Sequence, residues 1–404
     1  MPGIPAVARA ALAIGYAQSP LNIAFDMPFE SPAEVAMHIE LLAIGTATPA
    51  LNITRSESVD AARALCAEDD DQGELLVSLY RQSGVETRQV VYRPEEFRRI
   101  VYGEGEYDSP FISKGIGDPG PSTACRMERF EVEALPLATE SSRQALERSG
   151  VDPGSITHLI TVSCTGMAAP GVDFGLMKAL GLPATVERTN VGFMGCHGAL
   201  NALRVARGLI AAEPEARVLL CSVELCSLHY SYGWNPKRMV GNALFADGSA
   251  AAVLAGSLGG DRSRRWRVAA NAACLFPNSE QAMSWFVRDH GFEMVLSTRV
   301  PGLIQKHLAP WLETWLQGRG LAIKDVASWA VHPGGPRVLV GVQEALGLEA
   351  DATDASRSVL ARHGNMSSAT VLFILDELIR RDAPRPCVAL GFGPGLAAEG
   401  ALLV

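Results

Sequence analysis

The chain has 404 residues, a formal net charge of -9 at pH 7, 48% hydrophobic residues and 20% charged residues. Its length allows two domains or one duplicated core, and its composition is that of an ordinary globular protein. The acidic balance, without any stripe of Lys and Arg, argues against nucleic-acid binding. No segment approaches the roughly 20 apolar residues of a membrane span, so we expect a cytoplasmic protein.

Residues 1–37 are rich in Pro and Ala and show neither a helical nor a strand period. Because the first strand pattern begins directly after Met37, one hypothesis is that Met37 is the true start. The alternative is an N-terminal extension that is disordered or clasps a partner. An intact mass beginning at Met1 would contradict the first hypothesis.

From Leu41 onward strand and helix patterns alternate, which is typical of an α/β fold whose sheets are covered by helices. A polar turn at 259–263 separates two halves of similar style, 38–258 and 264–404. Two similar halves indicate a duplicated core with its site at their junction. In chain order we expect strands at 38–45, 156–162, 216–223, 250–254, 267–275, 327–331, 387–392 and 401–404, helices at 74–82, 131–149, 300–316 and 367–380, and a solvated acidic loop at 68–71.

The most informative stretch is 186–206, where an extended run ends in a Gly-Cys-His-Gly turn and apolar residues then recur at helical spacing. Cys196 is therefore expected on a tight turn at a helix N-terminus. The unpaired N–H groups and the positive end of the helix dipole favour a thiolate, and a nearby protonated His would lower the thiol pKa further. The alternative is a buried structural cysteine, a common fate of free Cys.

Two other polar residues stand at the ends of expected elements. His332 follows an apolar strand and precedes a Pro-Gly-Gly-Pro turn that opens a helix, and Asn365 comes just before the last helix. Taken singly, a His at a strand end is most often structural, and such an Asn is most often an N-cap. Taken with Cys196, they form a Cys-His-Asn set on three loops. The tight turn at 391–396 is no phosphate loop, because a Pro interrupts its donors.

The eight cysteines include no Cys-x-x-Cys pair and no Cys/His pair at zinc spacing. A disulfide framework is not expected in a chain of this size without a strong secretory signal. We expect neither a metal ion nor a cofactor.

Six ordered motifs resemble those of the type III polyketide synthases, the chalcone-synthase-like branch of the thiolase superfamily. The resemblance extends from about Leu41 to Val404. It implies a homodimer, a thiolase-like αβαβα layered fold with duplicated halves, and coenzyme A thioesters as substrates of an acyltransferase. The motifs lie at 43–49, 192–198, 241–248, 332–336, 364–369 and 391–396.

The resemblance also implies roles for individual residues. Cys196 matches the acyl-accepting nucleophile, His332 and Asn365 match the other catalytic residues, and Phe245 matches a gatekeeper ring between the coenzyme A tunnel and the cavity. In this chemistry the thiolate attacks a starter thioester, and His332 and Asn365 donate to the enolate that malonyl decarboxylation leaves. A carboxylate beside that enolate would raise the barrier, since a unit charge at 4 Å is worth about 4 kcal/mol at an effective dielectric near 20. Phe245 could also be an ordinary core residue.

The sequences of residues 223–230 and of the run around Cys196 are similar to those of bacterial synthases of alkylresorcinols and alkylpyrones, which use long fatty acyl starters. A slot narrowed by Trp285 beside the flexible Met294 suits an alkyl chain. By this resemblance the residues that line or border the acyl pocket are Cys164, Thr165, Cys226, Leu228, His229, Trp285, Met294, Ser367 and Pro394.

Two departures from plant members bear on substrate delivery. Ala169 stands where plant enzymes have a Met that crosses the dimer interface, and the helix at 74–82 offers only Arg81 for coenzyme A phosphates. Docking therefore rests on Arg81, Arg88 or Arg337, or else the starter arrives on an acyl carrier protein.

Several alternatives stay open. The synthase could use a chalcone-like starter or malonyl-CoA alone. An initiating β-ketoacyl carrier-protein synthase uses the same Cys-His-Asn logic but stops after one condensation. A cysteine acyl hydrolase would release free acid without consuming malonyl-CoA, and a silent paralogue would act only as a subunit.

Overall fold

A nine-stranded mixed sheet organises the part of the chain that the computed structural model describes, residues 39–257 and 265–404. Its central strands are buried along their whole length, as in sheets covered on both faces. In spatial order the strands are β11 (Ser328–Val331), β12 (Cys387–Gly393), β13 (Ala397–Leu403), β8 (Trp266–Leu275), β1 (Ile39–Ala47), β7 (Asp247–Gly256), β6 (Arg217–Leu225), β4 (His158–Ser163) and β5 (Glu187–Gly192).

The sheet contains one four-stranded pattern twice. β1 pairs antiparallel with β7, β7 antiparallel with β6, and β6 parallel with β4. The strands β8, β13, β12 and β11 repeat this order and these directions. The two patterns meet where β1 pairs with β8 over two residue pairs, Glu40 with Arg267 and Leu41 with Trp266. The similar halves expected from the sequence are therefore present, joined along one edge.

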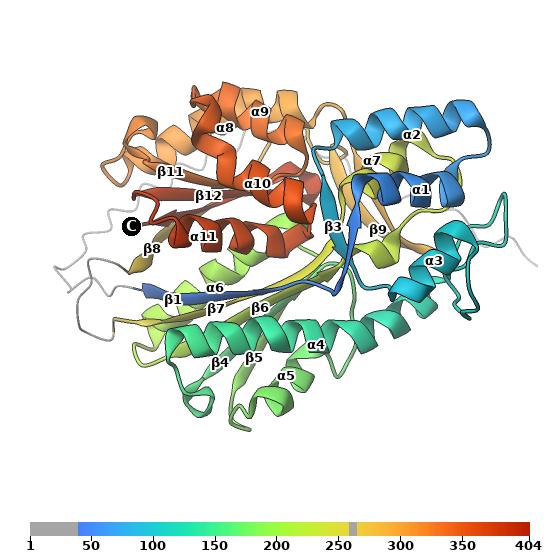
Figure 1. The fold of residues 1–404 in the computed structure, drawn as a ribbon. Helices are drawn as coiled ribbons and strands as arrows, with labels where there is room; N and C mark the ends of the chain where they lie inside the picture. The colour runs from blue at the N-terminus through green and yellow to red at the C-terminus, as the bar shows by residue number, and fades with distance from the viewer. Residues whose placement is uncertain (1–38, 258–264) are drawn as a thin grey trace, which may run out of the picture. The chain divides into compact units, whose positions relative to one another are not determined.

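Helices form three layers around the two halves of the sheet (Figure 1). Two of them lie in the middle and pack against strands of both halves, and the others cover the outer faces. This is the αβαβα arrangement that the resemblance implies. The middle helices are α6 (Gly198–Ala212) and α11 (Thr370–Arg380), and the outer ones are α4 (Thr123–Ser149) and α5 (Val172–Leu180) on the first half and α8 (Val300–Gln317) and α9 (Pro336–Leu346) on the second, with α10 (Asp354–His363) beside α11.

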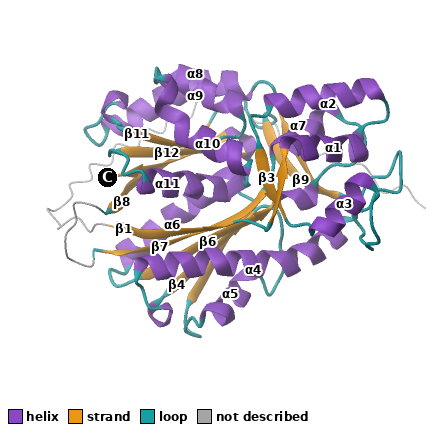
Figure 2. Ribbon diagram, viewed as in Figure 1, coloured by secondary structure: helices purple, strands orange, loops and turns teal. Residues whose placement is uncertain are grey.

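A smaller group of elements lies at the end of the large sheet from which the loop of Cys196 emerges (Figure 2). It contains two antiparallel strand pairs and four helices, most of which the sequence patterns did not reveal. Its elements are β2 (Leu51–Thr54), α1 (Arg55–Cys66), α2 (Asp70–Gln82), β3 (Thr87–Val90), α3 (Pro94–Tyr102), α7 (Pro236–Leu244), β9 (Met283–Arg288) and β10 (Gly291–Leu296).

Three sequence-based expectations are corrected at element ends. The acidic run expected as a loop forms the start of α2, because Asp69 caps the helix by accepting the N–H of Gln72 and acidic residues stabilise a first turn. Helix α4 begins at Thr123, eight residues before the expected start (131 - 123 = 8), since Ser122 caps it. The last helix begins at Thr370, after a single 3-10 turn. The extension at 1–37 and the turn at 259–263 lie outside the described residues.

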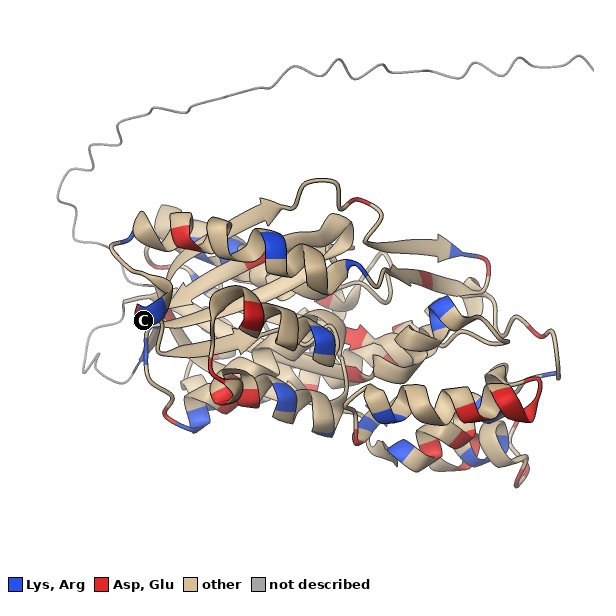
Figure 3. Cartoon of the chain, turned by 90° about the horizontal axis from the view of Figure 1, so that it is seen from above, with Lys and Arg blue, Asp and Glu red and all other residues tan. Residues whose placement is uncertain are grey.

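Basic and acidic residues are interspersed along the described ribbon (Figure 3). Several are paired within one helix, for example Arg380 with Asp376 at 2.9 Å and Arg129 with Glu133 at 3.0 Å. Arg129 and Glu133 are both partly exposed, and such pairs contribute little to stability. Among the described residues, no helix combines the length and the apolar character needed to cross a bilayer.

Candidate active site

Cys196 lies in the turn between β5 and α6, where the sequence places it. A single 3-10 turn, Gly195–His197, leads directly into the helix. The backbone before it is unusual, since Phe193 has φ 57° and Gly195 has φ 71°. A side chain at Gly195 would meet the Pro394 ring at 2.3 Å. Glycine is needed here because the turn is left-handed and the loop of Pro394 packs against it.

Asn365 reaches the site through backbone pairing with the chain that follows α7. Its N–H donates to the Leu244 carbonyl and its carbonyl accepts the N–H of Ala246, both at 2.9 Å. Its side-chain oxygen accepts the N–H of Ser367 at 2.8 Å, which leaves the amide NH₂ free to donate. Both that amide and the Ser367 hydroxyl hydrogen-bond Cys196. Ser367 holds φ 46°, a strained conformation of the kind that collects at functional sites.

His332 lies at the end of β11, where its N–H donates to the Leu390 carbonyl at 2.8 Å. The residue is 1% exposed, yet among the described residues neither ring nitrogen has a hydrogen-bond partner. Burial, with a smaller contribution from the neighbouring His197, lowers the pKa of His332 to about 3. The imidazole is therefore neutral, and both of its nitrogens are uncommitted.

The resting protonation of the nucleophile differs from the sequence-based expectation. Burial raises the pKa of the Cys196 thiol to about 12, and the charge of Glu224 raises it as well. Hydrogen bonds from Ser367 and Asn365 lower this pKa without offsetting the burial. The directions of these pKa shifts favour a thiol and a neutral imidazole in the free protein, in place of the expected thiolate and protonated His, because burial of the thiol outweighs the helix dipole.

Glu224 is a site residue that the sequence reasoning missed. Its buried carboxylate accepts hydrogen bonds from the Ser368 hydroxyl, from the Thr165 hydroxyl at 2.7 Å and from the Cys164 N–H at 3.0 Å. Its charge acts on Cys196, so the expectation of a site without a carboxylate needs correction. Burial raises the pKa of Glu224 while these hydrogen bonds lower it. A lone Glu inside the apolar strand β6 was the available signal.

A cavity of about 880 Å³ opens beside these candidate catalytic residues. Phe245 links these residues to the cavity. Its backbone forms a β-bridge with Asn365, and its ring centroid lies 6.3 Å from that of Trp285. The indole of Trp285 in turn donates to the Cys164 carbonyl at 2.8 Å. The expected substrate-binding residues that line the cavity are Phe245, Cys226, His229, Trp285, Met294 and Arg88.

The other expected binding residues do not line this cavity. Cys164 accepts the N–H of Gly195 at 3.0 Å and so adjoins the nucleophile turn. Leu228 belongs to the core beneath α4, where its carbonyl accepts from Arg126, because its side chain points to the covered face of the sheet. Besides Leu228, those that lie around the nucleophile or on the surface instead of in the cavity wall are Cys164, Thr165, Ser367, Pro394, Arg81 and Arg337.

Comparison with known families matches the two halves of the fold separately. The model described as "Chalcone and stilbene synthases, N-terminal domain" matches residues 33–258, and the corresponding C-terminal domain matches residues 267–404. The chain belongs to the chalcone and stilbene synthase family, the type III polyketide synthases. The synthase is therefore an acyltransferase that condenses malonyl-CoA.

Individual relatives agree with this family. The chain is 34% identical over 365 residues to 1,3,6,8-tetrahydroxynaphthalene synthase of Streptomyces peucetius, covering 89% of this chain and 92% of the relative. It is 32% identical to the alpha-pyrone synthesis polyketide synthase-like Pks18 of Mycobacterium tuberculosis, covering 93% of each. The crystal structure of PKS-I from the brown alga Ectocarpus siliculosus is 30% identical, with a TM-score of 0.83 over 92% of this chain and 99% of the other.

Arg88 has a structural role in the synthase. Its guanidinium donates to the carbonyls of Asn242 and Phe245 at 2.9 and 2.8 Å and to that of Ala243 at 2.5 Å. These are the carbonyls at the end of α7, which a cation stabilises. Arg88 is also 5% exposed, so its guanidinium serves these carbonyls, and coenzyme A docking on it stays a prediction. Through its hydrogen bond to the Phe245 carbonyl, Arg88 fixes the backbone of Phe245.

His229 forms a fixed aromatic wall of the cavity. Its Nδ1 accepts the N–H of Phe292 at 3.0 Å, which leaves Nε2 to donate to the Thr165 carbonyl at 2.6 Å. The ring stacks on that of Phe292 at 4.1 Å and meets Trp285 edge-on at 5.9 Å. Burial lowers the pKa of His229 to about 3. With both nitrogens committed, His229 shapes the cavity and holds no proton for transfer.

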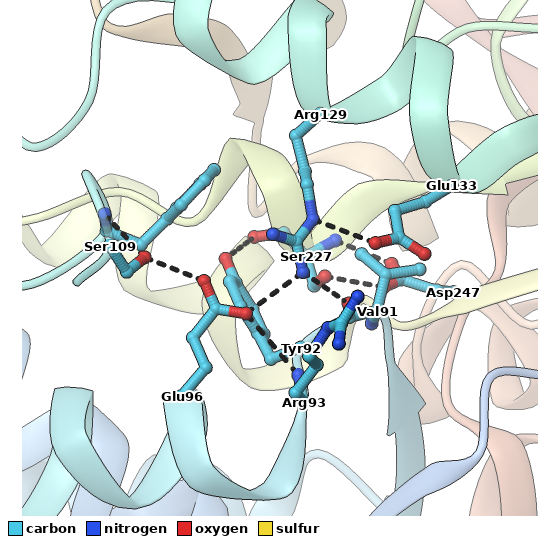
Figure 4. A network of polar contacts seen from close by, with 10 residues as sticks. Val91, Tyr92, Arg93, Glu96, Ser109, Arg129, Glu133, Ser227 and Asp247 are labelled. Atoms are coloured by element: carbon cyan, nitrogen blue, oxygen red, sulfur yellow. Dashed lines mark hydrogen bonds and ion pairs between the residues drawn. The ribbon is translucent and has the colours of Figure 1, made fainter. Parts of the chain in front are cut away.

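A polar network fixes another wall of the cavity (Figure 4). The carboxylate of Asp247 accepts the N–H groups of Val91 and Ser227 at 2.8 and 2.7 Å. Tyr92, which lines the cavity, donates to the Ser227 carbonyl at 3.1 Å. Burial raises the pKa of Asp247 to about 7. The Asp of the motif at 241–248 therefore ties β3 to the segment that follows β6, next to Cys226.

The resting thiol has a measurable consequence. We expect iodoacetamide to alkylate Cys196 of the free synthase about tenfold faster for each pH unit between about pH 7 and 10, without a plateau, because only the thiolate reacts and its fraction grows tenfold per unit below the pKa. Peptide mass spectrometry measures the rate at each pH, and a Cys196→Ala variant identifies the peptide. A pH-independent rate over this range would show a preformed thiolate and contradict the prediction.

Proposed function

We propose that the synthase loads a long-chain fatty acyl-CoA onto Cys196, extends it repeatedly with malonyl-CoA and closes the chain to an alkylpyrone or an alkylresorcinol. The volume and the lining of the cavity support this proposal. Its volume of about 880 Å³ is near the upper end of the roughly 300–1,000 Å³ usual for small-molecule sites. Phe245, Trp285 and Phe292 give it an apolar wall, and Met294 supplies an adaptable one.

Loading begins with proton transfer, because Cys196 rests as a thiol. His332 has two uncommitted nitrogens and accepts this proton as the sulfur attacks the starter carbonyl. The imidazolium so formed faces the developing oxyanion and stabilises it. Coenzyme A then leaves as a thiol, and the acyl group stays on Cys196 as a thioester.

Extension needs donors at the oxygen of the malonyl thioester. Loss of carbon dioxide leaves an enolate, which Asn365 stabilises through its NH₂ group while His332 supplies a second donor. The orientation of the Asn365 amide is set by the Ser367 N–H, which occupies the side-chain oxygen. The Glu224 carboxylate accepts hydrogen bonds from several neighbouring donors, which reduces the cost of its charge near the enolate.

A second candidate is a synthase that uses malonyl-CoA alone. The observation in its favour is the 34% identity to a tetrahydroxynaphthalene synthase, whose named product carries no alkyl chain. The identity to the alpha-pyrone synthase-like relative is 32%, so similarity by itself does not choose between the two. The apolar wall favours the alkyl starter.

We also propose that Arg238 and Arg288 take the place of Arg81, Arg88 and Arg337 in coenzyme A docking. Both side chains line the cavity, are 41% and 56% exposed, and share Glu293 at 3.2 and 3.3 Å. Phosphates prefer such accessible guanidinium groups. Delivery of the starter on an acyl carrier protein is the alternative.

We also propose that the synthase forms a homodimer. β5 is an edge strand of the sheet with most of its residues exposed, and an uncovered edge is a ready surface for pairing with a second copy.

The test is an incubation of the purified synthase with labelled malonyl-CoA and acyl-CoA starters from acetyl to stearoyl, read by mass spectrometry. We expect triketide and tetraketide pyrones or resorcinols from the long starters. Products from malonyl-CoA alone would establish the second candidate. A single condensation would indicate an initiating β-ketoacyl synthase, and free acid without malonyl consumption would indicate a hydrolase.

A further inference from the structure

We propose that the synthase binds a divalent cation of the first transition row, zinc above all, between His158, Glu187 and Glu213. These residues begin β4, begin β5 and follow α6. Because β5 leads to Cys196 at its far end and α6 runs back from it, the three residues lie at the end of the sheet opposite the nucleophile (Figure 1). The site is independent of the catalytic one.

The three side chains converge on one point. His158 and Glu187 are direct neighbours in the parallel pairing of β4 and β5. The Nε2 atom of His158 lies 3.8 Å from the carboxylate of Glu187 and 4.0 Å from that of Glu213. One ligand atom from each residue can be chosen so that all three lie within 4.8 Å of one another. His158 is 3% exposed, and within the described part of the chain its Nε2 has no hydrogen-bond partner.

The contacts of Nδ1 allow His158 to present a lone pair at Nε2. The Thr157 hydroxyl can donate its one hydrogen to the Arg217 carbonyl at 3.2 Å while it accepts the Arg217 N–H at 3.0 Å. Nδ1 of His158, 2.8 Å from the same oxygen, is then the donor, and in this tautomer Nε2 keeps a lone pair that faces two carboxylates. Three acceptors around one point repel each other unless a cation lies between them.

The distances favour a metal ion over a proton. An N–H on Nε2 would need an oxygen at about 2.7–3.2 Å to form a hydrogen bond, which is shorter than either separation here. Zinc with ligands at about 2.0–2.2 Å in a tetrahedron sets its ligand atoms roughly 3.3–3.5 Å apart. The carboxylates can close the remaining gaps, which are at most about 1.5 Å for the widest pair, since the side chains of Glu187 and Glu213 are 73% and 59% exposed. The buried imidazole stays in place.

The ligand types identify the class of ion and its role. One imidazole and two carboxylates suit zinc and its neighbours, whereas magnesium and calcium prefer oxygen alone. The hydrogen bond from Nδ1 to Thr157 is the outer contact that metal-binding histidines commonly make. The ion would join β4, β5 and the end of α6, and so stabilise the support of the Cys196 turn. The expectation of no metal ion considered only ligands close together in the sequence. His158, Glu187 and Glu213 are far apart in the sequence, so it did not include them.

The test is a calorimetric titration of the chelator-treated full-length synthase with zinc chloride, with cobalt chloride as a spectroscopic probe. We expect one zinc ion per chain, a rise in Tm, and a cobalt spectrum without the thiolate charge-transfer band that cysteine ligands produce. His158→Gln and Glu213→Gln should each weaken binding at least tenfold. The matched control is Glu215→Gln, which removes an exposed carboxylate two residues away.

Each outcome decides the proposal. Weakened binding in Glu213→Gln with unchanged binding in Glu215→Gln supports it, even where His158→Gln fails to fold, because Glu213 is exposed at a helix end. Absence of zinc binding at about micromolar concentrations, equal binding by all variants, or a thiolate band overturns it.

Discussion

A Cys196→Ala variant is expected to lose polyketide formation by a factor of at least about 10⁴, the scale seen when a catalytic nucleophile is removed. Without the thiol no acyl-enzyme can form, so the mass adduct left by an acyl-CoA starter should vanish from the intact protein. Decarboxylation of malonyl-CoA should persist, because it needs the donors of His332 and Asn365 and no sulfur. Mass spectrometry of the protein and chromatography of the thioesters measure both results.

The matched control is Cys274→Ala, which removes a half-buried thiol on β8 outside the catalytic group. It should keep both the adduct and the products. An adduct that survives in Cys196→Ala, for example on the adjoining Cys164, would contradict the assignment of the nucleophile.

An Asn365→Asp variant is expected to keep starter loading and to lose malonyl-CoA decarboxylation, the reverse of the Cys196→Ala variant. The substitution keeps the shape of the side chain and the oxygen that accepts the Ser367 N–H, but it replaces the NH₂ donor with negative charge. A unit charge at about 4 Å from the enolate costs about 4 kcal/mol at an effective dielectric near 20, which is roughly a 10³-fold loss in rate. The starter should still load onto Cys196, while carbon dioxide release from malonyl-CoA should fall by this factor.

The pH dependence separates this electrostatic effect from misfolding. Lowering the pH protonates the new carboxylate, which regains a donor, so the decarboxylation rate of Asn365→Asp should rise relative to that of the unmodified synthase as the pH falls. A ratio that stays constant with pH would mean that the charge is not the cause. Loss of the starter adduct in this variant would point to structural damage instead.

Glu224, the buried carboxylate near Cys196, is a residue whose role could not be inferred from the sequence. Glu224 occurs in an apolar strand, and from its position alone it could be an internal ion pair or an error in the strand assignment. Only the convergence of Ser368, Thr165 and Cys164 around it explains how it is held. These partners come from two segments of the chain, 164–165 and the turn at Ser368, and both are far from Glu224 in the sequence.

The arginines illustrate the same limit. Arg81 and Arg88 were equivalent candidates in the sequence, because both are cations near the expected tunnel. The structure gives Arg88 three backbone carbonyls and leaves Arg81 on the surface. Which cation is free to meet a phosphate depends on partners far away in the sequence.

The sequence by itself determined the family and the layered α/β class, and it predicted the Cys-His-Asn set. These follow from local patterns, because a nucleophile turn, a strand-end His and an Asn before a helix each need a few adjacent residues of the right type. The tertiary structure alone decided the protonation of Cys196, the engagement of Arg88, the cavity wall and the meeting of His158 with two carboxylates. Burial and electrostatic energy depend on distances in space, and those distances join segments that no local pattern relates.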